Sequence, residues 1–378
     1  MTSLVKFADV VHLSTSRLAD PSAAGIERYV GLEHITPENL HIRNWGLVSE
    51  GTTFTSHFKP GQVLFGKRRA YQRKVAIAEF EGVCSSDIYV FERKDPDVLL
   101  PELLPFICQS EGFFQFALKT SAGSLSPRTR WSDLANYEFP LPSIDEQRHI
   151  ADILRAVDDA IQELEILANA SQRLQRSIQE NLLLDTSPES EPFRERLDTI
   201  FEINPSEPPL SADSPFIAME AVDEWKREIT RYDNKGSRGG VRARAGDVLL
   251  ARITPSLENG KTAIVPTNIP RCGGSTEFIV IRGKKGVNTE LAYWIATSHS
   301  VRKIAIGSMH GSTGRQRVSA NDFASIRIKL SDTQNTNDIV RMLNSTYETY
   351  QNISVHIQLT RDLKNKLLGK CLVSSDDE

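Results

Sequence analysis

The chain repeats itself once along its 378 residues, and this duplication limits the possible folds more than any other feature. KPGQVLFGKR from Lys59 matches RAGDVLLARI from Arg244, and VCSSDIYVF from Val83 matches GGSTEFIVI from Gly273. FADVVHLS, YVGLEHI and GSLSPRTRWSDL in the first half also have counterparts in the second, in the same order and at offsets between 185 and 190 residues. Because this period is far too long for a solenoid, the sequence predicts two similar globular domains.

Each half ends in a segment that is typical of a long helix. In LPSIDEQRHIADIL, Ser143 is a good N-cap and Glu146 stands three residues later, which is the pattern of a capping box. Ser331 and Gln334 repeat this pattern 188 positions further on. Apolar residues then recur in steps of three and four, as in a coiled coil. We therefore predict two helices of about 40 residues, each of order 60 Å long at roughly 1.5 Å per residue.

Neither helix can bury its apolar seam alone, so we expect the two helices to pair as an antiparallel coiled coil. The predicted positions for helix pairing and partner docking are Ile150, Leu154, Val157, Ile161, Leu164 and Ile178 in the first helix, and Ile339, Leu343, Tyr350, Ile353, Ile357 and Leu363 in the second.

The globular halves contain short β-rich runs bounded by Gly, Pro or Ser, and one helical stretch each. The predicted fold class is therefore α+β. Two similar mixed α/β domains, over residues 1–142 and 193–330, are joined by long helices over 143–185 and 331–370 with pseudo-two-fold symmetry.

Composition excludes several classes of protein. The chain has no apolar run of 18 residues, so we expect no membrane span and a cytoplasmic location. The four cysteines form no C-x-x-C pair, which argues against a zinc site and against a disulfide framework. The net charge of −4 gives no overall basic footprint, although Lys and Arg gather locally.

Basic residues gather in three segments. GKRRAYQRK holds five of them around Tyr71, and two Gly/Ser-rich loops hold two arginines each. Arginine binds phosphate, or guanine in a bidentate manner, and an aromatic side chain can stack on a base. The alternative is that these charges lie on a solvated strand edge. The candidate DNA-binding residues are Lys67, Arg68, Arg69, Tyr71, Arg73, Lys74, Arg128, Arg130, Arg252, Lys261, Arg315 and Arg317.

These features together resemble the specificity subunit of type I restriction–modification enzymes. The resemblance rests on YVGLEHI and FIAMEAV, on the two arginine loops, and above all on LPSIDEQRHIADILRAVDDAI, and it covers nearly the whole chain. The second copy departs from the family pattern, because IKLSDTQNTNDIV lacks both the Pro-Leu-Pro and the Glu-Gln pair.

The resemblance implies a sequence-specific DNA-recognition subunit without catalytic activity of its own. Each globular domain would be a target-recognition domain that reads one half of a bipartite, asymmetric site in double-stranded DNA, in grooves roughly 34 Å apart. The helices would set the spacer and dock two methyltransferase subunits, which nuclease–translocase subunits would join. No cofactor is expected in this chain, since S-adenosylmethionine would bind to the methyltransferase.

Enzymatic alternatives find little support in the sequence. ENGKT at residues 258–262 lacks the glycine five positions before Gly260 that a phosphate-binding loop requires, since position 255 is proline. INPSEPP does not continue into the Pro-aromatic pair of a methyltransferase, and no histidines have metal-ligand spacing. The competing hypothesis from another class is a duplicated scaffold protein that does not bind DNA.

Overall fold

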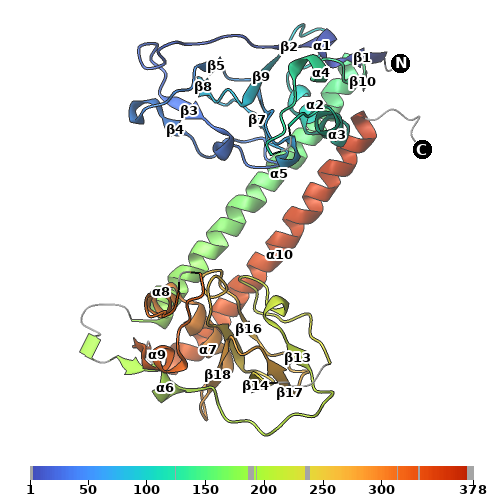
Figure 1. Cartoon of the computed structure of the whole chain (residues 1–378). Helices are drawn as coiled ribbons and strands as arrows, with labels where there is room; N and C mark the ends of the chain where they lie inside the picture. Colours follow the sequence, from blue (N-terminus) through green and yellow to red (C-terminus); the bar gives the residue numbers. More distant parts are fainter. Residues whose placement is uncertain are drawn as a thin grey trace. The chain divides into compact units, whose positions relative to one another are not determined.

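A computed structural model of the chain describes residues 3–123, 125–185, 191–192, 194–234, 239–312, 314–330 and 333–372 (Figure 1). Two compact units emerge from it. The first unit comprises Met1–Glu165 together with Val355–Glu378, and the second comprises Ile166–Ser354. Each unit therefore contains one globular domain and a part of each long helix. The predicted domain boundaries follow the helix ends instead, and they stay a prediction.

The first unit has two four-stranded sheets, ordered β4-β3-β8-β5 and β2-β9-β6-β7, and a two-stranded ribbon of β1 and β10. All pairings are antiparallel except that of β3 with β8. The strands are β1 (Ser3–Lys6), β2 (Val11–Leu13), β3 (Arg28–Val30), β4 (Gly46–Leu47), β5 (Ser56–Phe58), β6 (Val63–Gly66), β7 (Val75–Ile77), β8 (Gly82–Cys84), β9 (Ile88–Arg93) and β10 (Glu138–Leu141). The short helices are α1 (Phe7–Val10), α2 (Leu104–Gln109), α3 (Glu111–Lys119) and α4 (Trp131–Leu134).

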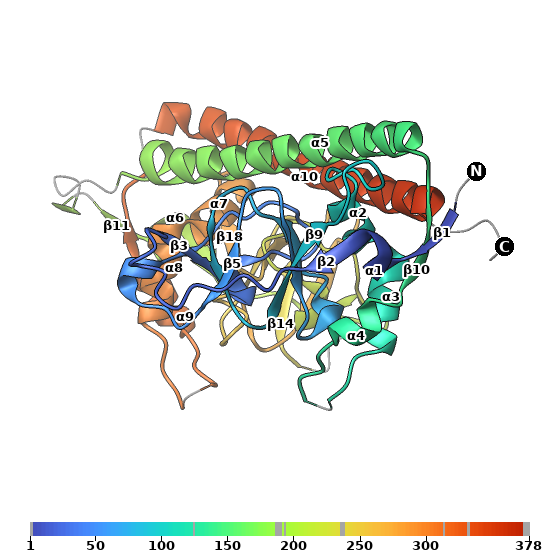
Figure 2. The ribbon, with the colours of Figure 1, turned by 90° about the horizontal axis from the view of Figure 1, so that it is seen from above.

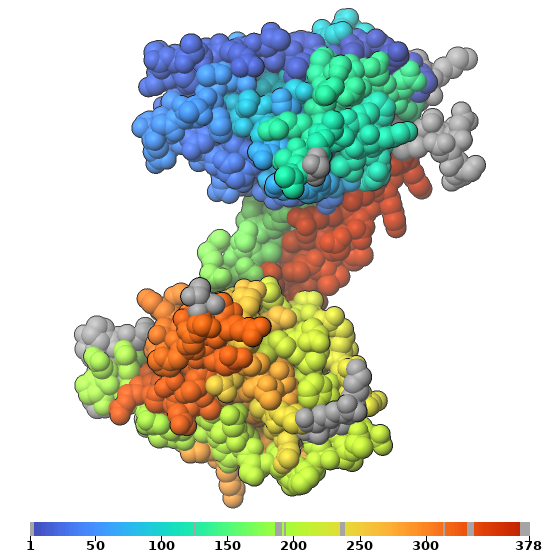
Figure 3. Space-filling view, in the orientation of Figure 1, coloured from blue at the N-terminus to red at the C-terminus, as the bar shows by residue number. Residues whose placement is uncertain are grey.

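The second unit has the same plan, with sheets ordered β12-β18-β15-β16 and β13-β17-β14 and a ribbon of β11 and β19. Its strands are β11 (Glu195–Arg196), β12 (Phe201–Ile203), β13 (Phe216–Ile217), β14 (Val241–Arg244), β15 (Val248–Ala251), β16 (Thr262–Ile264), β17 (Arg271–Gly274), β18 (Phe278–Gly283) and β19 (Arg327–Ile328). Its short helices are α6 (Leu197–Ile200), α7 (Thr289–Thr297), α8 (His299–Gly307) and α9 (Ala320–Ser325). In Figure 3, α8 and α9 (orange) lie at the surface of this unit.

Corresponding strands occupy corresponding places in the two units. The order β2-β9-β6-β7 becomes β12-β18-β15-β16, and the parallel pair of β3 and β8 becomes that of β13 and β17. Both large sheets are lined by buried Val, Leu, Ile and Phe side chains, which explains why the β-branched and aromatic runs form strands here. The predicted fold class, a duplicated mixed α/β domain with two long helices, is confirmed.

The long helices are α5 (Ile144–Ser177), which continues as a π-helical turn over Ile178–Leu183, and α10 (Thr333–Leu372). Within each unit they lie side by side (Figures 1 and 2). In the first unit, Arg361 Nη2 contacts Glu165 Oε1 at 2.6 Å and Lys364 pairs with Asp158, so the residue numbers run in opposite directions along the two helices. The helix pair is therefore antiparallel, as predicted.

The observed seam matches most of the predicted positions. Leu154, Ile161, Ile178, Ile339, Leu343 and Ile353 are buried, and Ile150, Val157, Leu164, Tyr350 and Ile357 are half-buried. Leu363 was predicted to pair with the other helix, but it is 49% exposed, while the neighbouring Lys364 is only 4% exposed. Helix pairing by Leu363 is therefore wrong, because an ion pair allows Lys364 to occupy the inward-facing position, while partner docking by Leu363 stays a prediction.

The start of α5 explains the Glu-Gln pair in its sequence. Ser143 and Glu146 form the predicted capping box, with the Ser143 N–H donating to Glu146 Oε2 at 3.0 Å. Gln147 is buried and anchors the helix to the domain, since its amide donates to the carbonyls of Val98 and Pro142 and accepts the N–H of Leu100. In the second copy, Ser331 and the Gln334 side chain lie outside the described residues.

No helix in the described residues is long and apolar enough to cross a membrane. Cys84, Cys108 and Cys272 are buried free thiols, and burial raises the pKa of Cys84 and of Cys272 to about 12. The described part of the chain contains no group of three or more His, Cys, Asp or Glu side chains arranged to hold a metal ion.

Candidate nucleic-acid interface

An arginine loop is tied to the sheet of the first unit through Asp87. The loop begins at Gly123, whose φ of +113° favours glycine, and a bridge between Arg128 and Arg68 brings the loop back to the end of β6. Arg128 Nε donates to Asp87 Oδ1 at 2.9 Å, and Arg68 Nη1 donates to Asp87 Oδ2 at 3.2 Å. Arg68 Nε also donates to the Ser126 hydroxyl at 2.7 Å. One carboxylate therefore holds two arginines of different segments together.

The second unit repeats this arrangement with Glu277. Its loop begins at Gly311, with φ of +134°, and Arg317 forms a bridge with Ile253 at the end of β15. Arg317 Nε donates to both carboxylate oxygens of Glu277, at 3.0 and 2.9 Å, and Nη2 donates to Oε1 at 2.7 Å. Ile253 replaces Arg68, so Arg317 alone donates to both oxygens of the Glu277 carboxylate.

The backbone hydrogen bonds show which arginines correspond. Thr129 N donates to the Lys67 carbonyl, and Val318 N donates to the Arg252 carbonyl, both at 2.9 Å. Each donor directly follows the arginine that pairs with the acid. Arg128 therefore corresponds to Arg317, and the second loop is one residue longer. We call the pairing of Asp87 with Arg128, and that of Glu277 with Arg317, the loop clamp of each unit.

Charge keeps both loop clamps ionised. Burial acts to raise the pKa of Asp87, but the hydrogen bonds and positive charges of Arg128 and Arg68 outweigh it and lower the pKa. The hydrogen bonds from Arg317 lower the pKa of Glu277. Lys67 lies beside this cluster with its Nζ 4.5 Å from the centre of the Tyr89 ring, and burial lowers its pKa.

Two of the predicted DNA-binding lysines contact the backbone of their own domain. Lys74 Nζ donates to the Leu32 carbonyl at 2.6 Å, and Lys261 Nζ donates to the Met219 carbonyl at 3.3 Å. Burial lowers the pKa of Lys74. Each lysine thus ties a strand end to a short 3-10 helix, Leu32–His34 in the first unit and Met219–Ala221 in the second. This gives the two lysines a structural role that the basic pattern did not predict.

The other candidate residues lie at different places. Arg73 pairs with Glu38 and Glu111 and lies over the Phe114 ring, away from the loop clamp. Arg69 is half-buried, as is Arg252, and in each the Nε is buried without a hydrogen-bond partner among the described atoms. Tyr71, Arg130 and Arg315 are exposed, and neither arginine has an ion-pair partner within the described residues. Arg128 is exposed too, although it pairs with Asp87.

The structure thus brings Lys67, Arg68 and Arg128 together in the first unit, and Arg252 and Arg317 in the second. The sequence analysis missed the acidic partners Asp87 and Glu277. A signal was present, because both occupy the same position in the matched segments VCSSDIYVF and GGSTEFIVI. An acid that recurs in both halves beside a repeated arginine loop is a pattern that predicts a clamp.

Comparisons with known proteins show what this chain is similar to. Residues 21–171 match the family model described as the type I restriction modification DNA specificity domain. A 132-residue part of the chain is 30% identical to the type I restriction enzyme EcoDI specificity subunit of Escherichia coli. That match covers 32% of this chain and 28% of the relative's length.

Two solved structures resemble the chain over nearly its full length. The S subunit of the type I restriction–modification system of M. genitalium aligns with a TM-score of 0.59 and 15% identity, covering 99% of this chain and 96% of that one. A chain from a study of complex assembly and conformational transition of the type I R-M system gives a TM-score of 0.56 and 18% identity, covering 98% and 97%. At these identities the likeness shows the fold. The match of residues 21–171 to the family model agrees with the resemblance predicted from the sequence.

Proposed function

We propose that this chain, whose residues 21–171 match the type I restriction modification DNA specificity domain, is the DNA-recognition subunit of a type I restriction–modification complex. Each globular domain reads one half of a bipartite, asymmetric DNA site. The observation that carries this proposal is the repetition of one loop clamp, on one sheet topology, in both units. Two similar but unequal domains on one chain suit a site with two unequal halves.

The loop clamp supports a division of labour among the arginines. Arg128 donates to Asp87 and Arg317 donates to Glu277, and these hydrogen bonds hold the loop in place. Arg130 and Arg315 are exposed next to them and are free to reach a phosphate or a base edge. We therefore assign Arg128 and Arg317, which pair with carboxylates, to positioning, and the unpaired Arg130 and Arg315 to DNA contact.

The long helices are proposed to set the spacer of the DNA site and to dock the partner subunits. Besides the buried seam, the two helices carry exposed large apolar side chains: Ile153, Ile166 and Leu167 on α5, and Val355 and Leu359 on α10. Exposed apolar side chains on a helix suit contact with other proteins. The partners proposed are two methyltransferase subunits and, for cleavage, nuclease–translocase subunits.

The chain is proposed to be non-catalytic, with S-adenosylmethionine bound by the methyltransferase subunit. Much of the phosphate contact would come from the partner subunits, which fits a net charge of −4 on this chain. Binding of the isolated chain to DNA is then expected to be weak and to fall steeply with salt.

Methylome sequencing tests the function directly. A host that expresses this chain with its methyltransferase should carry methylation at one interrupted motif, and that motif should vanish without the chain. Joint replacement of Arg128, Arg130, Arg315 and Arg317 by alanine should abolish the motif while the subunits still co-purify. Unchanged methylation of the same motif by this variant would contradict the proposal and favour the scaffold hypothesis.

Leu164→Asp tests the docking role. Leu164 is half-buried on α5, and a charge there should prevent assembly with the methyltransferase. Asp159→Asn, on an exposed position of the same helix, is the control that should assemble normally. Co-purification of the Leu164 variant at wild-type stoichiometry would count against docking on this helix.

A further inference from the structure

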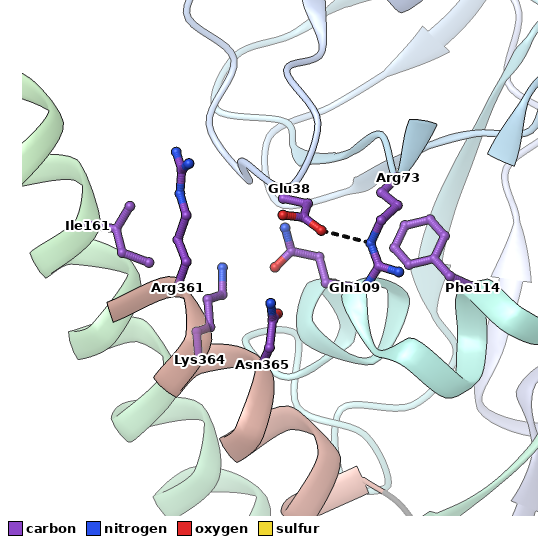
Figure 4. A pocket seen from close by; sticks show the side chains of 8 residues that line it. All are labelled: Glu38, Arg73, Gln109, Phe114, Ile161, Arg361, Lys364 and Asn365. Atoms are coloured by element: carbon purple, nitrogen blue, oxygen red, sulfur yellow. Dashed lines mark ion pairs between the residues drawn. The ribbon is translucent and has the colours of Figure 1, made fainter. Parts of the chain in front are cut away.

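The first unit contains a nearly filled pocket between its domain and the long helices (Figure 4). Its cavity volume is only about 20 Å³. Arg73 fills it by lying 4.6 Å from the centre of the Phe114 ring and pairing with Glu38 at 2.9 Å. On the helix side, Lys364 is neutralised by Asp158. The positive groups of this pocket are therefore matched by carboxylates.

The second unit has a pocket at the equivalent place, as its backbone shows. In the first unit, Glu38 N donates to the Arg73 carbonyl at 3.1 Å. In the second, Trp225 N donates to the Gly260 carbonyl at 3.4 Å. All four residues have positive φ, at 59°, 52°, 58° and 73° in that order. Trp225 thus replaces the acid, and glycine replaces the arginine that fills the first pocket.

The second unit also has an arginine stacked on an aromatic ring, but the two groups have exchanged positions: the short helix supplies the arginine and the loop supplies the ring. Arg302 is the fourth residue of α8, as Phe114 is of α3, and it lies 4.3 Å from the centre of the Trp225 ring. Gly260 makes room for this ring, because a Cβ there would come within 2.6 Å of it. The Arg302 Nη2 donates to two backbone carbonyls, while its Nε has no hydrogen-bond partner among the described atoms.

The carboxylates of the first pocket have no counterpart in the second. Arg176 on α5 corresponds to Lys364, 188 positions later, but the position of Asp158 is taken by Thr346. Glu111, which pairs with Arg73, is likewise replaced by His299. Arg176 forms no ion pair with any described residue, and no Asp or Glu is among the described residues that line this pocket. Two guanidinium groups therefore face one cavity without a carboxylate on its wall.

The second pocket is also open. Its cavity volume is about 240 Å³, close to the lower end of ligand pockets, which is roughly 300 Å³. Tyr350 and the Arg302–Trp225 stack offer planar surfaces. Gln172 and Gln175 line the wall, and their side-chain amides have no hydrogen-bond partners in the described part of the chain. An amide of this kind can pair with the donor and acceptor on the edge of a base.

We propose that this pocket of the second unit, lined by Arg176, Arg302, Trp225, Tyr350, Gln172 and Gln175, binds one nucleotide. The base stacks on the planar groups, and the phosphate lies against the guanidinium groups. The nucleotide is either free or part of a DNA strand, since both present a planar base and one phosphate. The inference does not depend on the proposed target recognition by the loops, and its failure would leave that function standing.

Calorimetric titration of the full chain with AMP, adenosine, inorganic phosphate and a short single-stranded oligodeoxyadenylate tests the site. AMP or the strand should bind saturably, and adenosine and phosphate should each bind at least about tenfold more weakly than AMP. Binding by AMP alone supports a free nucleotide, and binding by the strand alone supports a nucleotide within DNA. The absence of saturable binding by both at millimolar concentration would overturn the proposal.

Variants locate the binding in this pocket. Arg176→Gln removes one guanidinium at an exposed position, and Thr346→Asp supplies the carboxylate that the first unit has. Both should weaken nucleotide binding by about tenfold or more, with unchanged thermal unfolding. Arg173→Gln is the matched control, because Arg173 is an exposed arginine on the same helix that does not line the pocket. Equal binding by Arg176→Gln and wild type would place the ligand elsewhere and refute the assignment.

Discussion

Lys364 on α10 donates a hydrogen bond to Asp158 on α5, and both side chains are buried, with exposed fractions of 5% and 10%. His41 Nε2 contacts the other oxygen of the same carboxylate at 2.9 Å. Burial acts to raise the pKa of Asp158, but the His41 hydrogen bond and the Lys364 charge outweigh it and lower the pKa. The two helices and the globular domain of the first unit therefore meet at one buried charge.

We expect Asp158→Asn to destabilise the first unit by about 3 kcal/mol, because it leaves the buried Lys364 ammonium without a counter-charge. Urea unfolding of the full chain, followed by circular dichroism, measures this loss. Asp159→Asn, at the next and exposed position, should change the unfolding free energy by less than about 0.5 kcal/mol.

Replacing both partners distinguishes a lost ion pair from a packing defect. Asp158→Leu together with Lys364→Met removes both charges, and such replacements are often nearly neutral. The double variant should therefore be more stable than Asp158→Asn. If the double variant is instead less stable than both Asp158→Asn and wild type, the lost ion pair does not explain the destabilisation by Asp158→Asn.

The stability of the first unit should also depend on His41. Hydrogen bonds from this ring to Asp158 and Glu79 raise its pKa above the ordinary value of 6.5, against the effect of burial. A pKa that is raised by folding contributes stability that is complete below pH 6.5 and is lost as pH rises through the folded-state pKa. The urea concentration at the unfolding midpoint should therefore decrease as the pH is raised above 7. His41→Gln should lack this part of the pH dependence, and an unchanged slope in that variant would rule out His41 as its source.

The architecture was predictable because it depends on patterns that repeat. The duplication, the capping box at Ser143 and the apolar seam all survive in the sequence as spacing, and the structure has the sheets and the helix pair that they predict. Periodicity missed Lys364 because it scores a lysine as solvent-facing. Only the position of Asp158, far away in sequence, makes that lysine an inward-facing residue and leaves Leu363 exposed.

The candidate DNA interface was less predictable, since charge alone does not say where a side chain points. A basic run has the same sequence whether its residues face DNA, an acid or a carbonyl. Arg73 pairs with Glu38, Arg128 with Asp87, and Lys74 with the Leu32 carbonyl. Each partner lies far away in the sequence, so no short motif predicts these contacts. The matched acids at positions 87 and 277 were the one signal available.

The exposed and clamped arginines should differ in how they affect DNA binding by the assembled methyltransferase complex. Arg130→Ala and Arg315→Ala should each lower the salt dependence of affinity by about one phosphate contact. Arg317→Lys keeps the charge but cannot hold Glu277 in a bidentate manner, so it should loosen the loop. We expect faster amide hydrogen exchange at Arg317 and His310 in that variant, with an unchanged salt slope. The same salt slope in wild type, Arg130→Ala and Arg315→Ala would contradict the assignment of DNA contact.

Lys74→Met and Lys261→Met should reduce stability without reducing DNA affinity. Each removes a hydrogen bond to a backbone carbonyl, at 2.6 Å in the first unit and 3.3 Å in the second, and one such hydrogen bond contributes about 1 kcal/mol. The shorter contact predicts the larger loss for Lys74. Thermal unfolding and DNA titration of the complex separate the two effects. Lys285→Met, at an exposed position, is the control for loss of one positive charge. A drop in DNA affinity for Lys74→Met beyond that of the control, at unchanged stability, would return this lysine to the DNA interface.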